Sequence, residues 1–157
     1  MKIVRIDEGF QRWDELLALI LSSFAYMNDR IDPPSSALKL TPATLADKAC
    51  AEIAYAAMQG DTLSGCIFLR PEEDCLYIGK LAIAPESQGR GVGRRLLAVA
   101  EQAAQDRGRA SLRLETRIEL VENHDVFSRW GFEKVAENAH PGFTRTTSIE
   151  MRKPVSA

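Results

Sequence analysis

Hydrophobic and polar positions in the first third of the chain predict a strand, then a helix, then a loop. Residues 2–6 form a short apolar run of the kind found in strands. Over residues 13–24 the apolar positions recur three and four residues apart, so they line one face of a helix. Residues 27–49 are rich in Pro, Ser, Asp and Thr, and a Pro-Pro pair there prevents a continuous helix. We expect a loop, with a weak second helix near Leu38 or over residues 43–49.

Three strand patterns follow in close succession, over residues 52–59, 63–70 and 75–84. The intervening segments, 60–61 and 71–74, carry the Gly, Asp and Pro residues that are typical of tight turns. Because such short connections join antiparallel neighbours, the pattern predicts an antiparallel meander.

The second half of the chain returns to helical spacing. Apolar positions keep this spacing over residues 92–107, and Gly108 is suited to the C-terminal cap of that helix. Residues 110–116 have a strand pattern, and a short amphipathic helix is predicted over residues 123–131. The tail, 133–154, contains two strand-like pieces around a His-Pro-Gly turn.

Composition limits the class of protein. A length of 157 residues suits one domain, spanning residues 1–157. With 45% hydrophobic residues, 27% charged residues and a net charge of -2, the chain as a whole is not a polyanion binder, and we expect no nucleic acid partner. Its apolar runs are too short to cross a membrane, and its first residues turn polar too soon for a signal peptide. We therefore expect a soluble cytoplasmic protein without a membrane partner.

The cysteines also indicate a cytoplasmic protein. Cys50, Cys66 and Cys75 are odd in number and lie in apolar surroundings, with no CxxC or Cys/His spacing of a metal site. We expect three buried thiols in a reducing environment and no bound metal.

The most distinctive stretch is PESQGRGVGRRLL, residues 85–97, which lies between a predicted strand and a predicted helix. Backbone N–H groups at a helix N-terminus lack partners, and the helix dipole adds partial positive charge, so such a place suits a phosphate. Glycine allows both a close approach and a positive φ, and arginine adds charge. The residues concerned are Gly89, Gly91, Gly93, Arg90, Arg94 and Arg95. On spacing alone, a flexible surface turn before a basic helix stays open.

Two common phosphate motifs do not match this stretch. A P-loop needs Lys-Ser or Lys-Thr, and the chain contains neither. A GxGxxG fingerprint fails because the third glycine position holds Arg94 or Leu96. Glu115 lies at about the right distance onward for a Rossmann site, which keeps that site as a minor rival. A Rossmann fingerprint follows the first strand of a parallel unit, however, and this one follows the last strand of a meander.

The stretch resembles the acetyl-CoA-binding motif of the GCN5-related N-acetyltransferases (GNAT superfamily), Q/R-x-x-G-x-G/A, through Gln88, Gly91 and Gly93. The order of predicted elements resembles that family over most of the chain, and RWGF, residues 129–132, matches the end of its Y-x-K-x-G-F segment. The resemblance implies an α/β fold with a central mixed, mostly antiparallel sheet of about six to seven strands and about four helices. It also implies that the fourth and fifth strands splay apart and that acetyl-CoA enters the gap.

The resemblance assigns cofactor contacts position by position. The strand that binds the pantetheine arm through its backbone, and whose N–H also polarises the thioester carbonyl, corresponds to Leu81, Ala82 and Ile83. The pyrophosphate turn corresponds to Gln88, Gly89, Arg90, Gly91, Val92, Gly93 and Arg94. Asn123 matches an asparagine that bonds the cofactor arm, although a helix N-cap is an equal alternative. Phe127 takes the place of a tyrosine that often protonates the departing thiolate, so it can pack against the arm but cannot donate a proton.

The implied reaction also needs a base, because an alkylammonium of pKa ~10.4 is protonated at neutral pH. The family often places a glutamate on the fourth strand, but this chain reads Tyr-Ile-Gly-Lys there. Four candidate bases remain, each with a structural alternative: Glu115, Glu119, His124 and Tyr77. The loop after the first helix lies over the acceptor pocket in the family, and four of its side chains are candidates for shaping that pocket: Tyr26, Asp29, Arg30 and Asp32.

These features predict an acetyl-CoA-dependent N-acetyltransferase that acetylates the amine of a small molecule or peptide by direct attack in a ternary complex. The alternative is a non-catalytic acyl-CoA-binding or sensor domain of the same fold. The acceptor, the preferred acyl chain and the choice between monomer and homodimer stay open.

Overall fold

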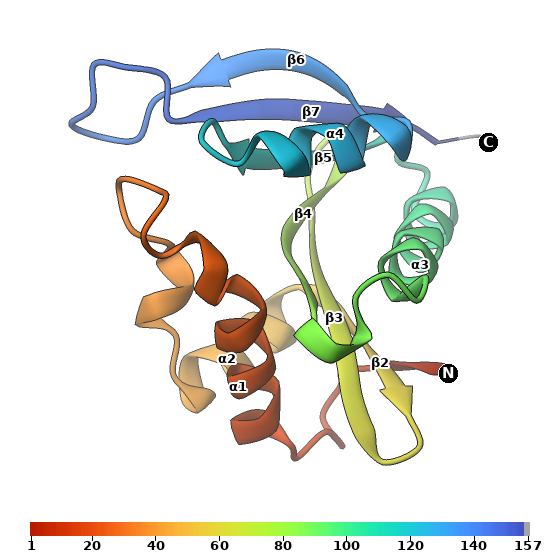
Figure 1. Cartoon of the computed structure of the whole chain (residues 1–157). Helices are drawn as coiled ribbons and strands as arrows, with labels where there is room; N and C mark the ends of the chain where they lie inside the picture. Colours follow the sequence, from red (N-terminus) through yellow and green to blue (C-terminus); the bar gives the residue numbers. More distant parts are fainter. Residues whose placement is uncertain (156–157) are drawn as a thin grey trace.

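A seven-stranded sheet crosses the molecule in the order β1-β2-β3-β4-β5-β7-β6 (Figure 1). The structure is a computed structural model that describes residues 1–155. Its strands are β1 (Lys2–Arg5), β2 (Ile53–Gln59), β3 (Thr62–Pro71), β4 (Cys75–Ile83), β5 (Ser111–Arg117), β6 (Glu133–Asn138) and β7 (Ser148–Pro154). All neighbouring strands are antiparallel except β4 and β5, which run parallel. The prediction of a mixed, mostly antiparallel sheet is confirmed.

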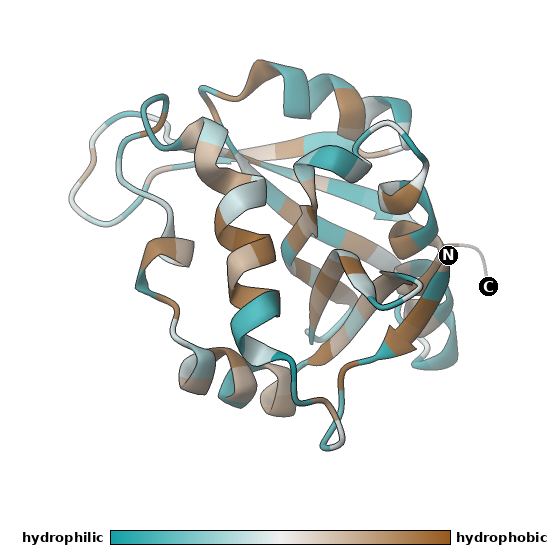
Figure 2. Ribbon diagram, turned by 60° about the horizontal axis from the view of Figure 1, so that its bottom comes forward, coloured by the Kyte–Doolittle hydropathy of each residue, from teal (hydrophilic) through white to brown (hydrophobic). Residues whose placement is uncertain are grey.

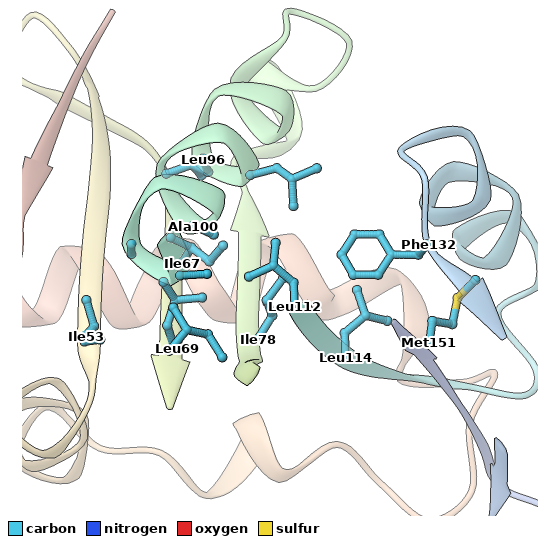
Figure 3. Packing of buried hydrophobic residues seen from close by; sticks show 14 of the residues in the cluster. Ile53, Ile67, Leu69, Ile78, Leu96, Ala100, Leu112, Leu114, Phe132 and Met151 are labelled. Atoms are coloured by element: carbon cyan, nitrogen blue, oxygen red, sulfur yellow. The ribbon is translucent and has the colours of Figure 1, made fainter. Parts of the chain in front are cut away.

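Helices cover both faces of the sheet. They are α1 (Trp13–Phe24), α2 (Pro42–Ala51), α3 (Val92–Asp106) and α4 (Val121–Arg129), with single 3-10 turns η1 (Ala25–Met27), η2 (Ser36–Lys39) and η3 (Pro85–Ser87). Helices α1 and α2 pack on one face, while α3 packs on the other (Figures 1 and 2). Figure 3 shows Leu96 and Ala100 of α3 lying over Ile67 of β3, in the larger of two main hydrophobic clusters.

Strands β4 and β5 separate halfway along their length. They pair from Cys75 with Ser111 as far as Ile78 with Leu114, and the pairing then stops. Gly79 has no partner in β3, which makes it a bulge, and bulges bend and twist a strand. Beyond it, β4 continues to Ile83 along β3 alone. We call the opening between the two strands the fork. It confirms the expected splayed strands.

Three expectations need correction in detail. The last helix begins at Val121 and not at Asn123, because the N–H of Asn123 already bonds the Leu120 carbonyl (3.0 Å). Asn123 is therefore inside the first turn and is not an N-cap. The expected buried thiol of Cys50 is exposed, because the apolar face of α2 lies along Leu45 and Ala49 and Cys50 falls beside that face. The weak second helix resolves into η2 and α2.

No helix among residues 1–155 combines the length and the apolar character that a membrane crossing requires.

Candidate active site at the fork

The fork opens into a cleft of about 1100 Å³. Its wall is built from the end of α1, the loop that follows α1, β4, the glycine turn (residues 88–93), β5, α4 and residues 140–143. Because it joins a strand edge to a helix N-terminus, the cleft offers unpaired backbone donors at both places.

The glycine turn places the start of α3 at the cleft. Gly91 is the N-cap of α3 with φ of 82°, and Gly89 has φ of 78°, a region that side chains other than glycine rarely adopt. A Cβ on either residue would have no atom within 4 Å, so the turn is open toward the cleft. The first N–H groups of α3 have no intrahelical partner, and they face this open space together with the positive end of the helix dipole.

The arginines of residues 90–95 have different positions relative to the cleft. Arg94 lines the cleft, whereas Arg90 is exposed outside its lining. Arg95 donates to the Met1 carbonyl at 3.0 Å and so holds the N-terminal strand. Gln88 lines the cleft, and its amide nitrogen lies 3.5 Å from the Ile83 carbonyl, where it closes the turn onto β4.

Gly93 serves packing. A Cβ there would lie 2.8 Å from the ring of Trp130, so only glycine lets α3 and the end of α4 approach this closely. Trp130 meets Phe127 edge to face, with centroids 5.7 Å apart, and both rings line the cleft. Phe132, which also contacts Phe127, is buried in the core.

The free edge of β4 supplies backbone donors. Ala84 donates its N–H to the Ser64 carbonyl of β3 at 2.9 Å, and Ile83 donates its own to Ser23 Oγ at 3.1 Å. Because amide directions alternate along a strand, the N–H of Leu81 points away from β3, as that of Ile83 does, and into the fork. Leu81 and Ile83 line the cleft, whereas the side chain of Ala82 is buried under α1.

Two of the four candidate bases line the cleft. Glu115 is exposed on β5, and its carboxylate accepts a hydrogen bond from the Asn138 amide at 2.8 Å. The ring of Tyr77 lies against Arg113 and Arg70, with centroid distances of 4.2 Å and 4.7 Å. Burial raises the pKa of Tyr77, so its hydroxyl stays protonated.

The other two candidates do not line the cleft. The Nε2 atom of His124 lies 2.9 Å from the Arg117 carbonyl, so it must carry the proton and donate. Glu119 accepts from the Asp32 N–H at 3.2 Å. Both side chains thus tie the end of β5 to neighbouring segments.

The loop after α1 bridges the fork. The Tyr26 hydroxyl accepts from Asn123 Nδ2 at 2.9 Å, and Tyr26 and Asn123 both line the cleft. Arg30 forms an ion pair with Glu122 of α4, at 2.9 Å between Nη2 and Oε2, which holds the pKa of Glu122 down at about 2. Arg30 and Asp29 do not line the cleft. Asp32 does not line it either, so of the four predicted pocket residues only Tyr26 lies at the cleft.

Sequence reasoning missed several cations of the cleft, among them Lys80 and Arg117. Lys80 of β4 is half-buried and donates to Ser36 Oγ at 3.1 Å, and burial lowers its pKa. Arg117 of β5 donates to the carbonyls of Pro33 (2.7 Å) and Pro34 (3.0 Å). A lone lysine within the apolar strand 75–84 was the available signal.

An open fork between parallel strands, followed by a glycine turn at a helix N-terminus, defines a protein that binds a phosphate-bearing ligand along one strand edge. The comparison with known proteins makes this class specific. The model of the acetyltransferase (GNAT) family matches residues 13–132, and the chain belongs to that family.

Solved structures share the fold. The chain is similar to the PaiA N-acetyltransferase of Thermoplasma acidophilum, solved with coenzyme A, with a TM-score of 0.80, 17% identity and coverage of 98% of this chain and 99% of that one. It is similar to the ribosomal-protein-S18-alanine N-acetyltransferase of Escherichia coli, with a TM-score of 0.69, 21% identity and coverage of 99% and 94%. An aminoglycoside 6'-N-acetyltransferase complexed with coenzyme A gives a TM-score of 0.75 and 18% identity over 100% and 98% of the two chains. The comparison with curated proteins found no match.

Proposed function

We propose that this protein transfers an acetyl group from acetyl-CoA to the amine of a small molecule or peptide, by direct attack within a ternary complex. The observation that carries the proposal is the pairing of two kinds of free backbone donor in one cleft. The amides at the start of α3 suit a pyrophosphate, and the Leu81 N–H at the fork suits a carbonyl oxygen.

The residues of the cleft are compatible with acetyl-CoA. Gly89 and Gly91 leave open space where a side chain would otherwise stand, and Arg94 adds positive charge at the same place. Phe127 and Trp130 offer an apolar wall for the pantetheine arm. When bound, acetyl-CoA supplies an activated thioester, and the remaining chemistry belongs to the protein.

Glu115 is the base that we propose. It lines the cleft on β5, across the fork from the free edge of β4, and its carboxylate is oriented by Asn138. It accepts a proton from the ammonium, directly or through one water, and so frees the amine to attack. The Leu81 N–H stabilises negative charge on the carbonyl oxygen, an effect worth roughly 2.7–4 kcal/mol per donor in other acyl transfers.

Direct attack is supported by the state of the cysteines. Burial raises the pKa of Cys66 to about 12 and that of Cys75 to about 11, so both are protonated and poor nucleophiles. Cys50 is exposed on α2 and does not line the cleft. A covalent acetyl-cysteine step therefore has no support in the cleft.

Phe127 favours a second candidate, a non-catalytic acyl-CoA-binding or sensor domain. The side chain at this position lines the cleft but carries no proton to donate. A thiol of pKa about 8.5 leaves readily as a thiolate, which is why we place the enzyme first.

The test is acetyl transfer to a panel of primary amines, measured by mass spectrometry of the product. We expect transfer by the wild type and a loss of about 10²–10⁴ in kcat for Glu115→Gln. Glu119→Gln, a matched change outside the cleft lining, should change kcat only a few-fold. Equal kcat in the wild type and Glu115→Gln would remove Glu115 from this role. Retained coenzyme A binding with no product from any amine would favour the sensor.

A further inference from the structure

Two cations of the cleft, Lys80 and Arg117, lie beside residues 33–36 of the loop that follows α1. Lys80 belongs to β4, one residue beyond the bulge, and Arg117 is the last residue of β5. Both line the cleft, and both contact the same loop segment, residues 33–36. The two arms of the fork therefore each contribute one positive charge on either side of that segment.

Neither cation has an anionic partner. Within residues 1–155, Lys80 bonds only the Ser36 hydroxyl, and Arg117 bonds only two backbone carbonyls. Burial lowers the pKa of Lys80, and the nearby charges of Lys48 and Arg117 add to this effect. His140, at the far side of the cleft, also has a pKa lowered by burial and then by Arg117. The lining of the cleft as a whole contains five cationic side chains and two carboxylates, Glu115 and Glu122, so it carries a net positive charge that a bound anion would offset.

The neighbouring carboxylates are already engaged elsewhere. Glu52 pairs with Lys48 at 2.6 Å, and Asp32 pairs with Arg145 at 3.3 Å. Glu119, whose charge also acts on Arg117, accepts the Asp32 N–H at 3.2 Å and does not line the cleft. Glu115 accepts one amide hydrogen bond and does line the cleft. The cleft thus combines the carboxylate of Glu115 with the two cations Lys80 and Arg117, a pattern complementary to a molecule carrying both an amine and an anion.

We propose that the acceptor carries an oxyanion group, a carboxylate or a phosphate, within a few bonds of its reactive amine, and that Lys80 and Arg117 bind this group while Glu115 faces the amine. This substrate class rests on the proposed acetyl transfer. The anion site itself is a property of Lys80 and Arg117, so it can be tested by binding alone.

The experiment uses protein saturated with coenzyme A, which fills the phosphate sites of the glycine turn. Calorimetric titrations compare 4-aminobutyrate with butylamine, and O-phosphoethanolamine with ethanolamine. We expect the anionic member of a pair to bind at least about tenfold more tightly, since hydrogen bonds to charged groups are strong. The two pairs together show whether the site takes a carboxylate or a phosphate.

Two variants test whether the tighter binding of anionic ligands depends on Lys80. Lys80→Met keeps the length of the side chain and removes its charge, and it should weaken the anionic ligands about tenfold or more while leaving the neutral amines unchanged. Lys134→Met makes the same change on β6 outside the cleft and should alter neither. Circular dichroism checks that each variant is folded.

The two proposals fail differently. Equal binding of anionic and neutral amines, or a loss of both in Lys80→Met, would overturn the anion site even if acetyl transfer occurs. Lys80-dependent binding of the anion without any acetylated product would leave the anion site in place and overturn the transferase.

Discussion

Gly91 and Gly93 lie two residues apart in the glycine turn, yet different physical demands select glycine at each. Gly91 has a positive φ and open space around it, so its backbone conformation is what requires glycine. Gly93 is helical, and a Cβ there would lie 2.8 Å from the Trp130 ring, so any other residue would force that ring to move. The sequence motif suggested the same reasons, close approach and positive φ, for Gly89, Gly91 and Gly93, because a sequence pattern does not separate conformation from packing.

The cofactor role of Gly91 can be isolated from its conformational role by a matched pair of variants. Gly91→Ala and Gly108→Ala both place a side chain at positive φ in open space, so each should cost about 1 kcal/mol of stability. Only Gly91 lies at the cleft, so only Gly91→Ala should weaken coenzyme A binding, by about tenfold in a calorimetric titration. Equal weakening in Gly108→Ala would show that the loss comes from stability and not from the site.

The sequence predicted the site residues that belong to a local motif, and it missed those whose role depends on the direction of the side chain or on neighbours from other segments. The glycine turn and Phe127 were found because a local motif carries them. Glu119 and His124 were equal to Glu115 in the sequence, and only the direction of each side chain separates them. Lys80 was noted only as a departure from the expected glutamate, since its unpaired charge depends on what the loop places beside it.

At the scale of elements, a set of ion pairs holds the closed end of the fork. Arg113 of β5 bonds Glu72, in the turn between β3 and β4, at 2.9 Å, and it bonds Glu150 of β7 at 3.1 Å. Arg152 of β7 reaches Asp74 of the same turn at 3.3 Å. Because these contacts join β5 and β7 to the β3–β4 turn where β4 and β5 still pair, the strands can diverge at the other end without separating.

These ion pairs predict that the free energy of unfolding depends on pH. The hydrogen bond from Arg113 lowers the pKa of Glu72 from 4.5 to about 2. A pKa that is lower in the folded state gives stability that is complete above pH 4.5 and is lost as the pH falls toward 2. Glu72→Gln should therefore lower the free energy of unfolding by up to about 1 kcal/mol at pH 7, or about 2–4 °C in Tm, because solvent screens the pair.

The difference between wild type and Glu72→Gln should vanish near pH 2 when thermal unfolding is followed by circular dichroism. Glu73→Gln changes the neighbouring exposed residue of the same turn and should have almost no effect at either pH. A destabilisation by Glu72→Gln that is the same at pH 7 and near pH 2 would mean that Glu72 acts through packing.

The elements themselves were largely predictable, because each has its own periodicity and its own turn residues. The strands at 53–59, 62–71 and 75–83 lie within one residue of their predicted bounds. The start of α4 was wrong by two residues, since no polar N-cap marks it and Leu120 takes that place.

At the scale of the whole molecule, the cleft is assembled by contacts between segments distant in sequence. Tyr26 bonds Asn123 across 97 positions, and Arg30 bonds Glu122 across 92. Strand β7 lies between β5 and β6, so the last two strands enter the sheet in reverse chain order and β6 forms its edge. Periodicity within one segment does not encode such pairings, which is why the bridging loop was predicted as a neighbour of the pocket and not as a tie to α4.

The proposed function requires that coenzyme A binds in the fork, with its pyrophosphate at the glycine turn and its arm along β4. Amide NMR spectra of the protein, labelled with ¹⁵N and titrated with coenzyme A, test this most directly. We expect saturable shifts for the amides of Leu81, Gly89 and Gly91, and little change for Gly60 and Gly108, which lie outside the cleft. Saturable shifts elsewhere, with Leu81 and Gly91 unmoved, would contradict it.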